Sequence, residues 1–407
     1  MRFAASSAGD GSRGWLDIPR DPARDRGAMH SSTMIRRTRV EVDLAAIIAN
    51  ARAVRAVTGT DVLAVVKADG YGHGAIAVVR ALAAARAVAG FGVSLVEEAV
   101  VLRDAGVMAP ILVMGPSQHG GEDDMVMAGL TPVIGSVEDL AALAAVARRR
   151  NRTIDAHLKV DTGMGRLGVP VAGAAELAVD AGRSGIAIVG LMTHFACADT
   201  DDPADPASMT RDQLRTFREV DRVVTAAGAP LRVRHAANSS GALLFPEARL
   251  DLVRTGIAIY GNGRWPTDDV ARPAMRLVTE VAQLRAIAEG TSVGYGATWR
   301  AARASRVAIL PLGYADGLPR HASGRAFAAI RGRRVPLVGV ISMDIAIADV
   351  TEVPEVAVGD AAVLLGRASG GASISVAEYG VWAGLSEYEV TCGMSKRVPR
   401  TYVGESP

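Results

Sequence analysis

Between residues 60 and 260, short apolar segments alternate with longer stretches that are rich in Ala and Arg. Each apolar segment is typical of a strand buried on both faces, and the longer stretches have helical spacing. We predict eight strands, at 63–66, 90–94, 111–115, 131–135, 157–160, 189–194, 233–238 and 253–260. Helices are predicted between them, at 75–88, 96–105, 136–150, 171–183 and 208–227. The connections after Gly115 and Asn238 are less clearly helical.

Eight such βα units within about 230 residues predict a (β/α)8 TIM barrel, a fold that typically needs about 250 residues. We assign this barrel to residues 43–275, with Asp43 as the cap of its first helix. An open, doubly wound sheet is the alternative, because counting strands from one sequence is uncertain by at least one.

From about residue 276, the alternation of strands and helices gives way to β-rich sequence with glycine turns. We predict a mostly β C-terminal domain over 276–407, with strands at 278–284, 306–312, 327–330, 338–349 and 361–365 and one helix near 375–384. The alternating stretch 38–42 can return to this domain as an extra strand. Residues 1–33 carry small polar clusters and predict a flexible N-terminal extension. Met29 and Met34 leave an internal start codon as the alternative explanation for it.

The composition narrows the class of partner. Of 407 residues, 45 are Lys or Arg and 43 are Asp or Glu, so a net charge of +2 gives no case for nucleic acid or an anionic membrane. No apolar run reaches the roughly 20 residues of a membrane span. Cys197 and Cys392 have no partners at metal-ligand spacing, which predicts no metal site and suits a reducing cytoplasm. We therefore expect a small-molecule partner and a cytoplasmic location.

Polar residues lie at the ends of several predicted strands, and the active site of a TIM barrel lies where its strands end. They are Lys67, Lys159, Asp161, His194, Asn238, Ser239 and Arg254. Taken singly, each is explained by an ordinary solvated loop, but together they converge on one rim. Lys67 is a candidate nucleophile, since burial lowers the pKa of a lysine and only the neutral amine reacts. Gly70, Gly72 and Gly74 let the backbone approach a ligand, and Tyr71 offers a hydroxyl.

The stretch from Ala64 to Gly74, AVVKADGYGHG, resembles the cofactor-lysine signature of the bacterial alanine racemases, which are fold-type III pyridoxal-phosphate enzymes. Gly70 departs from it, since alanine is usual there. The resemblance continues over most of residues 38–402. It implies pyridoxal 5'-phosphate (PLP) as cofactor, an amino acid as substrate, and a homodimer with shared active sites. The implied activity is the interconversion of L-alanine and D-alanine, which supplies D-alanine for peptidoglycan.

The resemblance also implies which residues hold the cofactor. Lys67 would bind it covalently, and Arg254 would face the pyridine nitrogen, which must accept because arginine only donates. The phosphate would be bound by Tyr71, Ser239, the backbone at Gly256 and Ile257, and Tyr388. The alternatives are purely structural roles, in which Arg254 pairs with Asp251 on a surface turn and Ser239 caps a helix.

Racemisation needs an acid-base group on each face of the substrate's α-carbon. By resemblance these groups are Lys67 and Tyr295, which comes from the partner subunit and is helped by His194. Arg166 would hold the substrate carboxylate, as a guanidinium fork suits, and would be oriented by a carbamylated Lys159. The backbone at Met343 of the partner and the access-narrowing Tyr314 would complete the substrate site. Without the family match, Tyr295 would be a tyrosine packed on its sheet and Lys159 a surface lysine.

Other functions remain open to comparison. A broad-specificity or serine-preferring racemase shares nearly all of these motifs. A decarboxylase of basic amino acids has the same domain plan but an acidic group at the pyridine nitrogen, so Arg254 argues against it. A non-catalytic PLP carrier is a lone barrel, so the second domain with Tyr295 argues against that.

Overall fold

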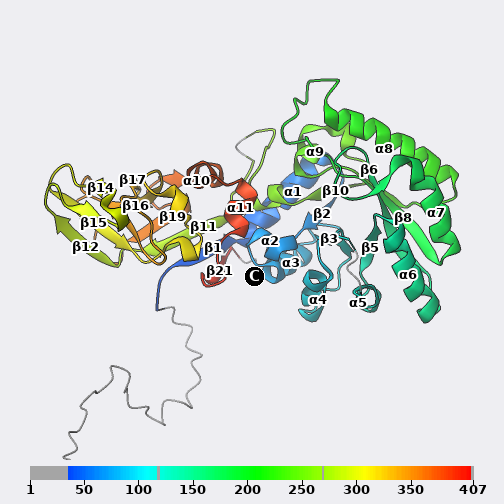
Figure 1. The fold of residues 1–407 in the computed structure, drawn as a ribbon, viewed down its shortest axis with the longest axis horizontal. Coiled ribbons are helices and arrows are strands. Elements are labelled where there is room, and N and C mark those ends of the chain that lie inside the picture. Colours follow the sequence, from blue (N-terminus) through cyan, green and yellow to red (C-terminus); the bar gives the residue numbers. More distant parts are fainter. Residues whose placement is uncertain (1–34, 117–119, 268–269, 405–407) are drawn as a thin grey trace, which may run out of the picture. The chain divides into compact units, whose positions relative to one another are not determined.

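The computed structural model, which describes residues 35–116, 120–267 and 270–404, contains the predicted barrel strands (Figure 1). Eight parallel strands follow one another in the order β10-β2-β3-β4-β5-β6-β8-β9. They are β2 (Asp61–Val65), β3 (Gly90–Val93), β4 (Ile111–Val113), β5 (Thr131–Ile134), β6 (Ile154–Asp161), β8 (Ile186–Met192), β9 (Val233–His235) and β10 (Leu252–Thr255). The short β7 (Val169–Pro170) pairs with β6. The predicted extension 1–33 lies outside the described residues.

The barrel is nearly closed where β9 meets β10. The backbone N–H of Arg254 donates to the carbonyl of Ala237 at 3.0 Å, and that of Asp251 donates to the carbonyl of Arg234 at 3.1 Å. The predicted TIM barrel is therefore confirmed, and the open-sheet alternative is wrong.

Helices surround the strands, and their apolar faces explain their packing. Asp43 caps α1 (Leu44–Thr58) as predicted, because its carboxylate accepts the N–H of Ala46 at 2.9 Å. α8 (Met209–Ala226) buries Leu214, Phe217, Val220 and Val224, spaced three or four residues apart. The remaining helices of this domain are α3 (Ala75–Ala84), α4 (Val96–Asp104), α5 (Glu122–Met127), α6 (Val137–Arg150), α7 (Ala174–Arg183) and α9 (Ser239–Leu244).

A mostly β C-terminal domain follows, as predicted. Its larger sheet has the order β17-β16-β19-β11-β1-β21, and its smaller sheet the order β12-β15-β18. The larger sheet comprises β17 (Arg333–Pro336), β16 (Phe327–Ile330), β19 (Ala361–Arg367), β11 (Met275–Glu280), β1 (Arg39–Asp43) and β21 (Arg400–Val403). The smaller comprises β12 (Gln283–Ile287), β15 (Ser305–Leu310) and β18 (Ala346–Asp349). β1 thus lies antiparallel to β11 and parallel to β21.

The shorter elements of this domain complete it. β20 (Ser373–Ile374) pairs with β19, and β13 (Ser292–Val293) pairs with β14 (Trp299–Arg300). The predicted helix near 375–384 is α10 (Val376–Ala383), and α11 (Glu387–Cys392) follows it. In the described ranges, no helix combines the length and the apolar character that crossing a membrane requires.

Three predicted strands are wrong in extent. The stretch 278–284 is two strands, because Val281 donates to the carbonyl of Asp360 and Ala282 to that of Ile309, so the chain passes from one sheet to the other there. The stretch 338–349 is a strand only in β18, since Gly339 turns the chain with a φ of 69°. The stretch 253–260 ends as a strand at Thr255 and continues as a 3-10 turn, η4 (Ile257–Tyr260).

Candidate active site

Lys67 opens an unusual left-handed turn at the end of β2. This turn, α2 (Lys67–Tyr71), has φ values of 52° at Ala68, 53° at Asp69 and 54° at Tyr71. Such backbone costs roughly 1–2 kcal/mol for each residue other than glycine. The surrounding structure fixes the turn, because Glu98 accepts the N–H of Ala68 at 2.7 Å and Asp69 accepts that of Ala75 at 2.8 Å. The backbone that carries Lys67 is therefore fixed by hydrogen bonds.

The glycines of the turn make room for the protein's own atoms. A Cβ at Gly72 would overlap the carbonyl oxygen of Thr391 in α11, and one at Gly74 would overlap the hydroxyl of Tyr402 in β21. Arg400 also donates from Nε to the carbonyl of Gly72 at 3.1 Å. The expectation that Gly72 and Gly74 admit a ligand is corrected, since they let the C-terminal domain pack on the Lys67 turn.

A cavity of about 410 Å³ lies at the carboxyl ends of the barrel strands. Most of the expected site residues line it, and they come from α11, from β10, and from the segments that follow β2, β6, β8, β9 and β10. They are Lys67, Tyr71, Arg166, His194, Ser239, Arg254, Gly256, Ile257 and Tyr388. The cavity is also lined by residues that the sequence did not single out, among them Met164, Asp199 and Cys392.

Arg254 is buried in the cavity wall and held by five hydrogen bonds. Nη1 donates to Nδ1 and to the carbonyl of His235, both at 2.9 Å. Nη2 donates to the carbonyls of Thr193 and Ala236 and to Nδ1 of His194, at 2.7, 3.0 and 3.1 Å. Within the described residues Nε–H makes no hydrogen bond, so one donor is left for a ligand. The surface-turn alternative is wrong, since Asp251 accepts the N–H of Arg234 instead.

His194 and His235 are neutral partners of this guanidinium. Burial lowers the pKa of each well below its usual value, and the charge of Arg254 lowers it further. Since arginine only donates, Nδ1 of His194 must accept, and its proton is therefore on Nε2. Burial also lowers the pKa of Arg254, to about 10, which leaves it protonated at neutral pH.

Hydroxyl and amide groups gather around Gly256. The hydroxyl oxygen of Ser239 accepts the N–H of Gly256 at 3.1 Å and that of Ala258 at 3.4 Å. Tyr71 reaches the same place, because a Cβ at Gly256 would overlap its hydroxyl. Burial raises the pKa of Tyr71, which therefore stays protonated and can donate. The ring of Tyr388 lies 6.1 Å from that of Tyr71.

Ser239 does not cap α9, so that expectation is wrong. Asn238 is the cap, since its side-chain oxygen accepts the N–H of Gly241 at 2.9 Å. The Ser239 hydroxyl is turned toward the Gly256 backbone instead.

The loop after β6 carries Arg166 to the cavity. The carboxylate of Asp161 accepts the N–H groups of Gly163, Met164 and Gly165 at 2.9 Å each, which orders the loop. The Arg166 side chain is exposed and forms no ion pair with any residue of the described ranges, so its guanidinium is available to an anion.

Lys159 lies in the barrel interior behind that loop. It is buried and lines a separate cavity of about 150 Å³. Burial first, and then the charge of Arg254, lower its pKa to about 8. The surface-lysine alternative is therefore wrong.

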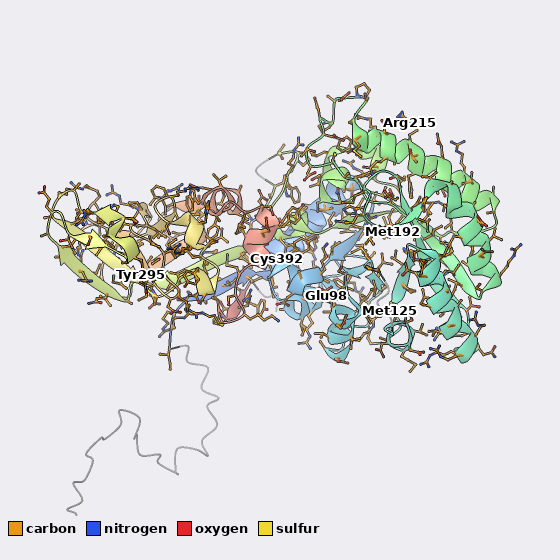
Figure 2. All side chains as sticks on the ribbon, in the orientation of Figure 1. Glu98, Met125, Met192, Arg215, Tyr295 and Cys392 are labelled. Carbon is orange, nitrogen blue, oxygen red and sulfur yellow. The ribbon has the colours of Figure 1, made fainter. Side chains whose placement is uncertain are left out.

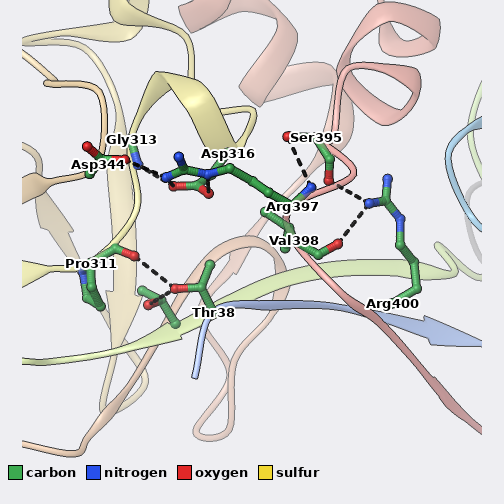
Figure 3. Close-up of polar contacts among 10 residues, drawn as sticks. Thr38, Pro311, Gly313, Asp316, Asp344, Ser395, Arg397, Val398 and Arg400 are labelled. Atoms are coloured by element: carbon green, nitrogen blue, oxygen red, sulfur yellow. Dashed lines mark hydrogen bonds and ion pairs between the residues drawn. The ribbon is translucent and has the colours of Figure 1, made fainter. Parts of the chain in front are cut away.

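Three expected residues stay outside the cavity of a single chain. Tyr295 lies in the C-terminal domain (Figure 2) and is 71% exposed, which excludes a tyrosine packed on its sheet. Tyr314 and Met343 are also exposed, and their loops lie together, because Tyr314 donates its N–H to the carbonyl of Ser342 at 3.0 Å. Arg397 clamps both loops through Asp316 and Asp344, each at 2.6 Å (Figure 3).

The sequence reading missed Glu98 and His235. Glu98 accepts the N–H groups of Ser94 and Leu95 besides that of Ala68. Glu98 is the third residue of α4, but the residue at the N-cap is Leu95 and not serine or threonine, so the sequence lacks the usual capping-box signature. His235 sits inside a predicted strand, and nothing in its neighbours distinguishes it from a core histidine.

Comparisons with known proteins agree with this architecture. A barrel-end lysine facing a buried arginine, next to a hydroxyl-lined pocket, defines a PLP-binding barrel enzyme with an added β domain. Residues 42–263 match the sequence model of the alanine racemase N-terminal domain, and residues 274–402 match that of its C-terminal domain. The chain belongs to the alanine racemase family.

Curated and solved relatives cover nearly the whole chain. An alanine racemase of Sorangium cellulosum is 43% identical over 383 residues, which span 90% of this chain and 99% of the relative. The solved alanine racemase of Streptomyces coelicolor A3(2) is 34% identical, with a TM-score of 0.85 over 91% of this chain and 98% of that one. That of Bartonella henselae, which has covalently bound pyridoxal phosphate, is 28% identical, with a TM-score of 0.80 over 90% and 99%.

The residues of this cavity fit PLP, the cofactor on which alanine racemases depend. Burial, and secondarily the charge of Arg166, lower the pKa of Lys67, which favours the neutral amine that a covalent bond to an aldehyde requires. The unused Nε–H of Arg254 suits an acceptor such as a pyridine nitrogen. The hydroxyls and backbone amides near Gly256 suit a phosphate without any cationic patch.

Proposed function

We propose that this protein interconverts L-alanine and D-alanine at the cavity described above, with Lys67 and Tyr295 as the two acid-base residues. The observation that most supports this is the arrangement of Arg254, which uses every N–H but Nε inside the protein and lines the same cavity as Lys67. PLP supplies an electron sink that lets the α-proton of a bound amino acid leave.

Lys67 accepts or returns the proton on one face of the substrate. Its lowered pKa supports this role, because a neutral amine is the basic form. Its left-handed turn, held by Glu98 and Asp69, fixes the backbone from which the Lys67 side chain projects. Arg166, which lines the cavity and forms no ion pair with the described part of the chain, binds the substrate carboxylate.

Tyr295 serves the opposite face, and it does so from a second copy of the chain. Its exposure on the C-terminal domain, together with that of Tyr314 and Met343, supports a homodimer in which these residues complete the partner's cavity. His194 carries its proton on Nε2, so it can donate to the phenol oxygen of Tyr295 and stabilise the phenolate. A phenol is a weak acid, so a tyrosine needs such stabilisation of its phenolate to act as a base at neutral pH.

Lys159 is proposed as a carbamylated residue that orients Arg166. Its pKa of about 8 supports this, since carbamylation begins from the neutral amine, and the cavity beside it offers room. The carbamate would place a negative charge near Arg254 and Arg166, two of the three cations whose charges lower the pKa of Lys159.

The cell would use this activity to supply D-alanine for peptidoglycan synthesis. We place the enzyme in the cytoplasm, because Cys197 and Cys392 are both free thiols.

Two measurements test the function. Purified holoenzyme should racemise L-alanine and D-alanine with a higher kcat/KM than serine or lysine; equal values for all three would replace this assignment with broad specificity. Borohydride reduction followed by peptide mapping should attach the cofactor to Lys67. The only other lysines are Lys159 and Lys396, so label on either of them would overturn the assigned site.

A further inference from the structure

Gln213 is a buried polar residue on the apolar face of α8, outside the cavity lining. Its side chain is 1% exposed and makes three hydrogen bonds. Oε1 accepts the N–H of Ala196 at 2.9 Å, and Nε2 donates to the carbonyl of His194 at 3.1 Å and to the hydroxyl of Thr162 at 3.3 Å. The bond from a backbone N–H fixes which end of the amide is the oxygen.

These three bonds end on two different loops of the candidate site. His194 and Ala196 belong to the segment that follows β8, whereas Thr162 belongs to the loop after β6 that carries Arg166. A second link runs beside the first, because the hydroxyls of Thr162 and Thr193 lie 2.7 Å apart. Gly163 packs on the Gln213 stem, since a Cβ there would lie 3.6 Å from Cγ of Gln213.

Asp161 orders the Arg166 loop internally, but its bonds stay within that loop. They do not fix the loop relative to the end of β8. Gln213 supplies that tie together with the Thr162–Thr193 hydroxyl pair, and its one planar amide bonds to both loops.

We propose that Gln213 is a positioning residue that sets the placement of Arg166 relative to His194. The proposal rests on the proposed function, in which Arg166 binds the substrate carboxylate and His194 assists Tyr295. A buried amide on a face otherwise made of residues such as Leu214 and Phe217 costs desolvation that only its hydrogen bonds offset. Those bonds reach no other part of the molecule than the two loops.

Two substitutions separate the bonds. Gln213→Met keeps the side-chain length and removes all three, whereas Gln213→Glu keeps the acceptor for Ala196 and removes both donors. Thr210→Val is the structural control, since Thr210 is equally buried one turn earlier on α8 and bonds only to Asp201. All variants are compared as holoenzymes, with thermal unfolding measured alongside.

Kinetics supply the first readout. Gln213→Glu should raise KM for alanine about tenfold with a smaller change in kcat, because the Arg166 loop loses its one bond from Gln213, whereas the His194 segment loses one of two and keeps the bond from Ala196. Gln213→Met should also lower kcat by roughly tenfold to a hundredfold, as misplacement of catalytic groups does. Thr210→Val should change neither, even if it lowers the Tm as much. A Gln213→Met variant that keeps wild-type KM and kcat would overturn the proposal, as would losses that match those of Thr210→Val.

Propionate binding supplies the second readout, and it needs no turnover. Propionate carries the carboxylate of alanine without its amine, so its Kd for holoenzyme reports on Arg166 alone. We expect about tenfold weaker propionate binding in both Gln213 variants and no change in Thr210→Val. Unchanged Kd values in the Gln213 variants would contradict the proposal. If the wild-type enzyme binds propionate but racemises no amino acid, the proposed function is wrong. The positioning role of Gln213 is then still tested by the propionate Kd values of the variants.

Discussion

The Nε2 atom of His235 lies 2.8 Å from Nδ1 of His157 in the barrel interior. On its other side, Nδ1 of His235 accepts from Arg254, so its proton must be on Nε2. His235 therefore donates to His157, which in turn carries its own proton on Nε2. In this series of hydrogen bonds, Arg254 donates to His235 and His235 donates to His157. A proton added to Nδ1 of either histidine would set two donors against each other.

This arrangement predicts a stability that depends on pH. Burial first, and the charge of Arg254 second, lower the pKa of His157 from the usual 6.5 to about 4. The unfolded chain therefore binds more protons between these values, so stability present above pH 6.5 is lost as the pH falls toward 4. The loss from this residue is at most about 3 kcal/mol.

His157→Asn removes that contribution while keeping a side-chain oxygen near Nδ1. Urea unfolding at pH 7, 5.5 and 4.5 should show a shallower fall in the free energy of unfolding for the variant than for the wild type. The difference between the two proteins isolates His157 from the carboxylates that titrate in both. Parallel curves would contradict the neutral-histidine chain.

Tyr295→Phe should separate cofactor binding from racemisation. The substitution removes only a hydroxyl from a side chain that is 71% exposed, so folding and the Lys67-dependent absorbance of the cofactor should persist. Racemisation should fall by about 10² to 10⁴-fold, the usual effect of losing an acid-base group. Exchange of the α-proton with deuterated solvent should be lost for the enantiomer whose proton Tyr295 removes and retained for the one whose proton Lys67 removes. Equal exchange of both enantiomers would reject the two-base assignment.

Mixing two inactive variants tests whether the site is shared. Lys67→Ala removes one acid-base residue and Tyr295→Phe the other, so each homodimer has two defective cavities. In a heterodimer, one cavity receives the intact Lys67 of one chain and the intact Tyr295 of the other. An equal mixture, dissociated and reassembled, should regain about a quarter of wild-type activity, since half the dimers are mixed and each has one good site. Two variants that stay inactive together would show that both residues serve the same chain's cavity.

Much of the barrel could be predicted because its signal is local. Buried parallel strands such as 111–115 and 131–135 are continuous apolar runs, and Asp43 is a typical N-cap residue directly before its helix. The left-handed turn could not be predicted, because Ala68, Asp69 and Tyr71 carry side chains that normally avoid positive φ. Contacts made far along the chain, with Glu98 and Arg400, help to hold that backbone in place.

The same distinction applies to the site. Lys67 follows a predicted strand and His194 ends one, which placed them on one rim, whereas Arg254 lies near the start of the predicted strand 253–260 and reaches the rim because that strand ends at Thr255. Gln213 and His235 act through partners that are remote in sequence, and no spacing reveals such bonds. The break of 278–284 into two strands likewise depends on which sheet each half joins, which the alternation of apolar residues does not encode.

Gly256→Ala should weaken cofactor binding through Tyr71. A Cβ at this position would overlap the Tyr71 hydroxyl, which must then move away from the amide groups around Ser239. We expect the Kd of PLP for the apoenzyme to rise at least about tenfold, a loss of roughly 1.4 kcal/mol that corresponds to one displaced hydrogen bond. Gly182→Ala is the control, since a Cβ there meets nothing within 4 Å. Titration of apoenzyme with PLP, followed by absorbance, measures both variants; an unchanged Kd in Gly256→Ala would remove Tyr71 from the proposed phosphate site.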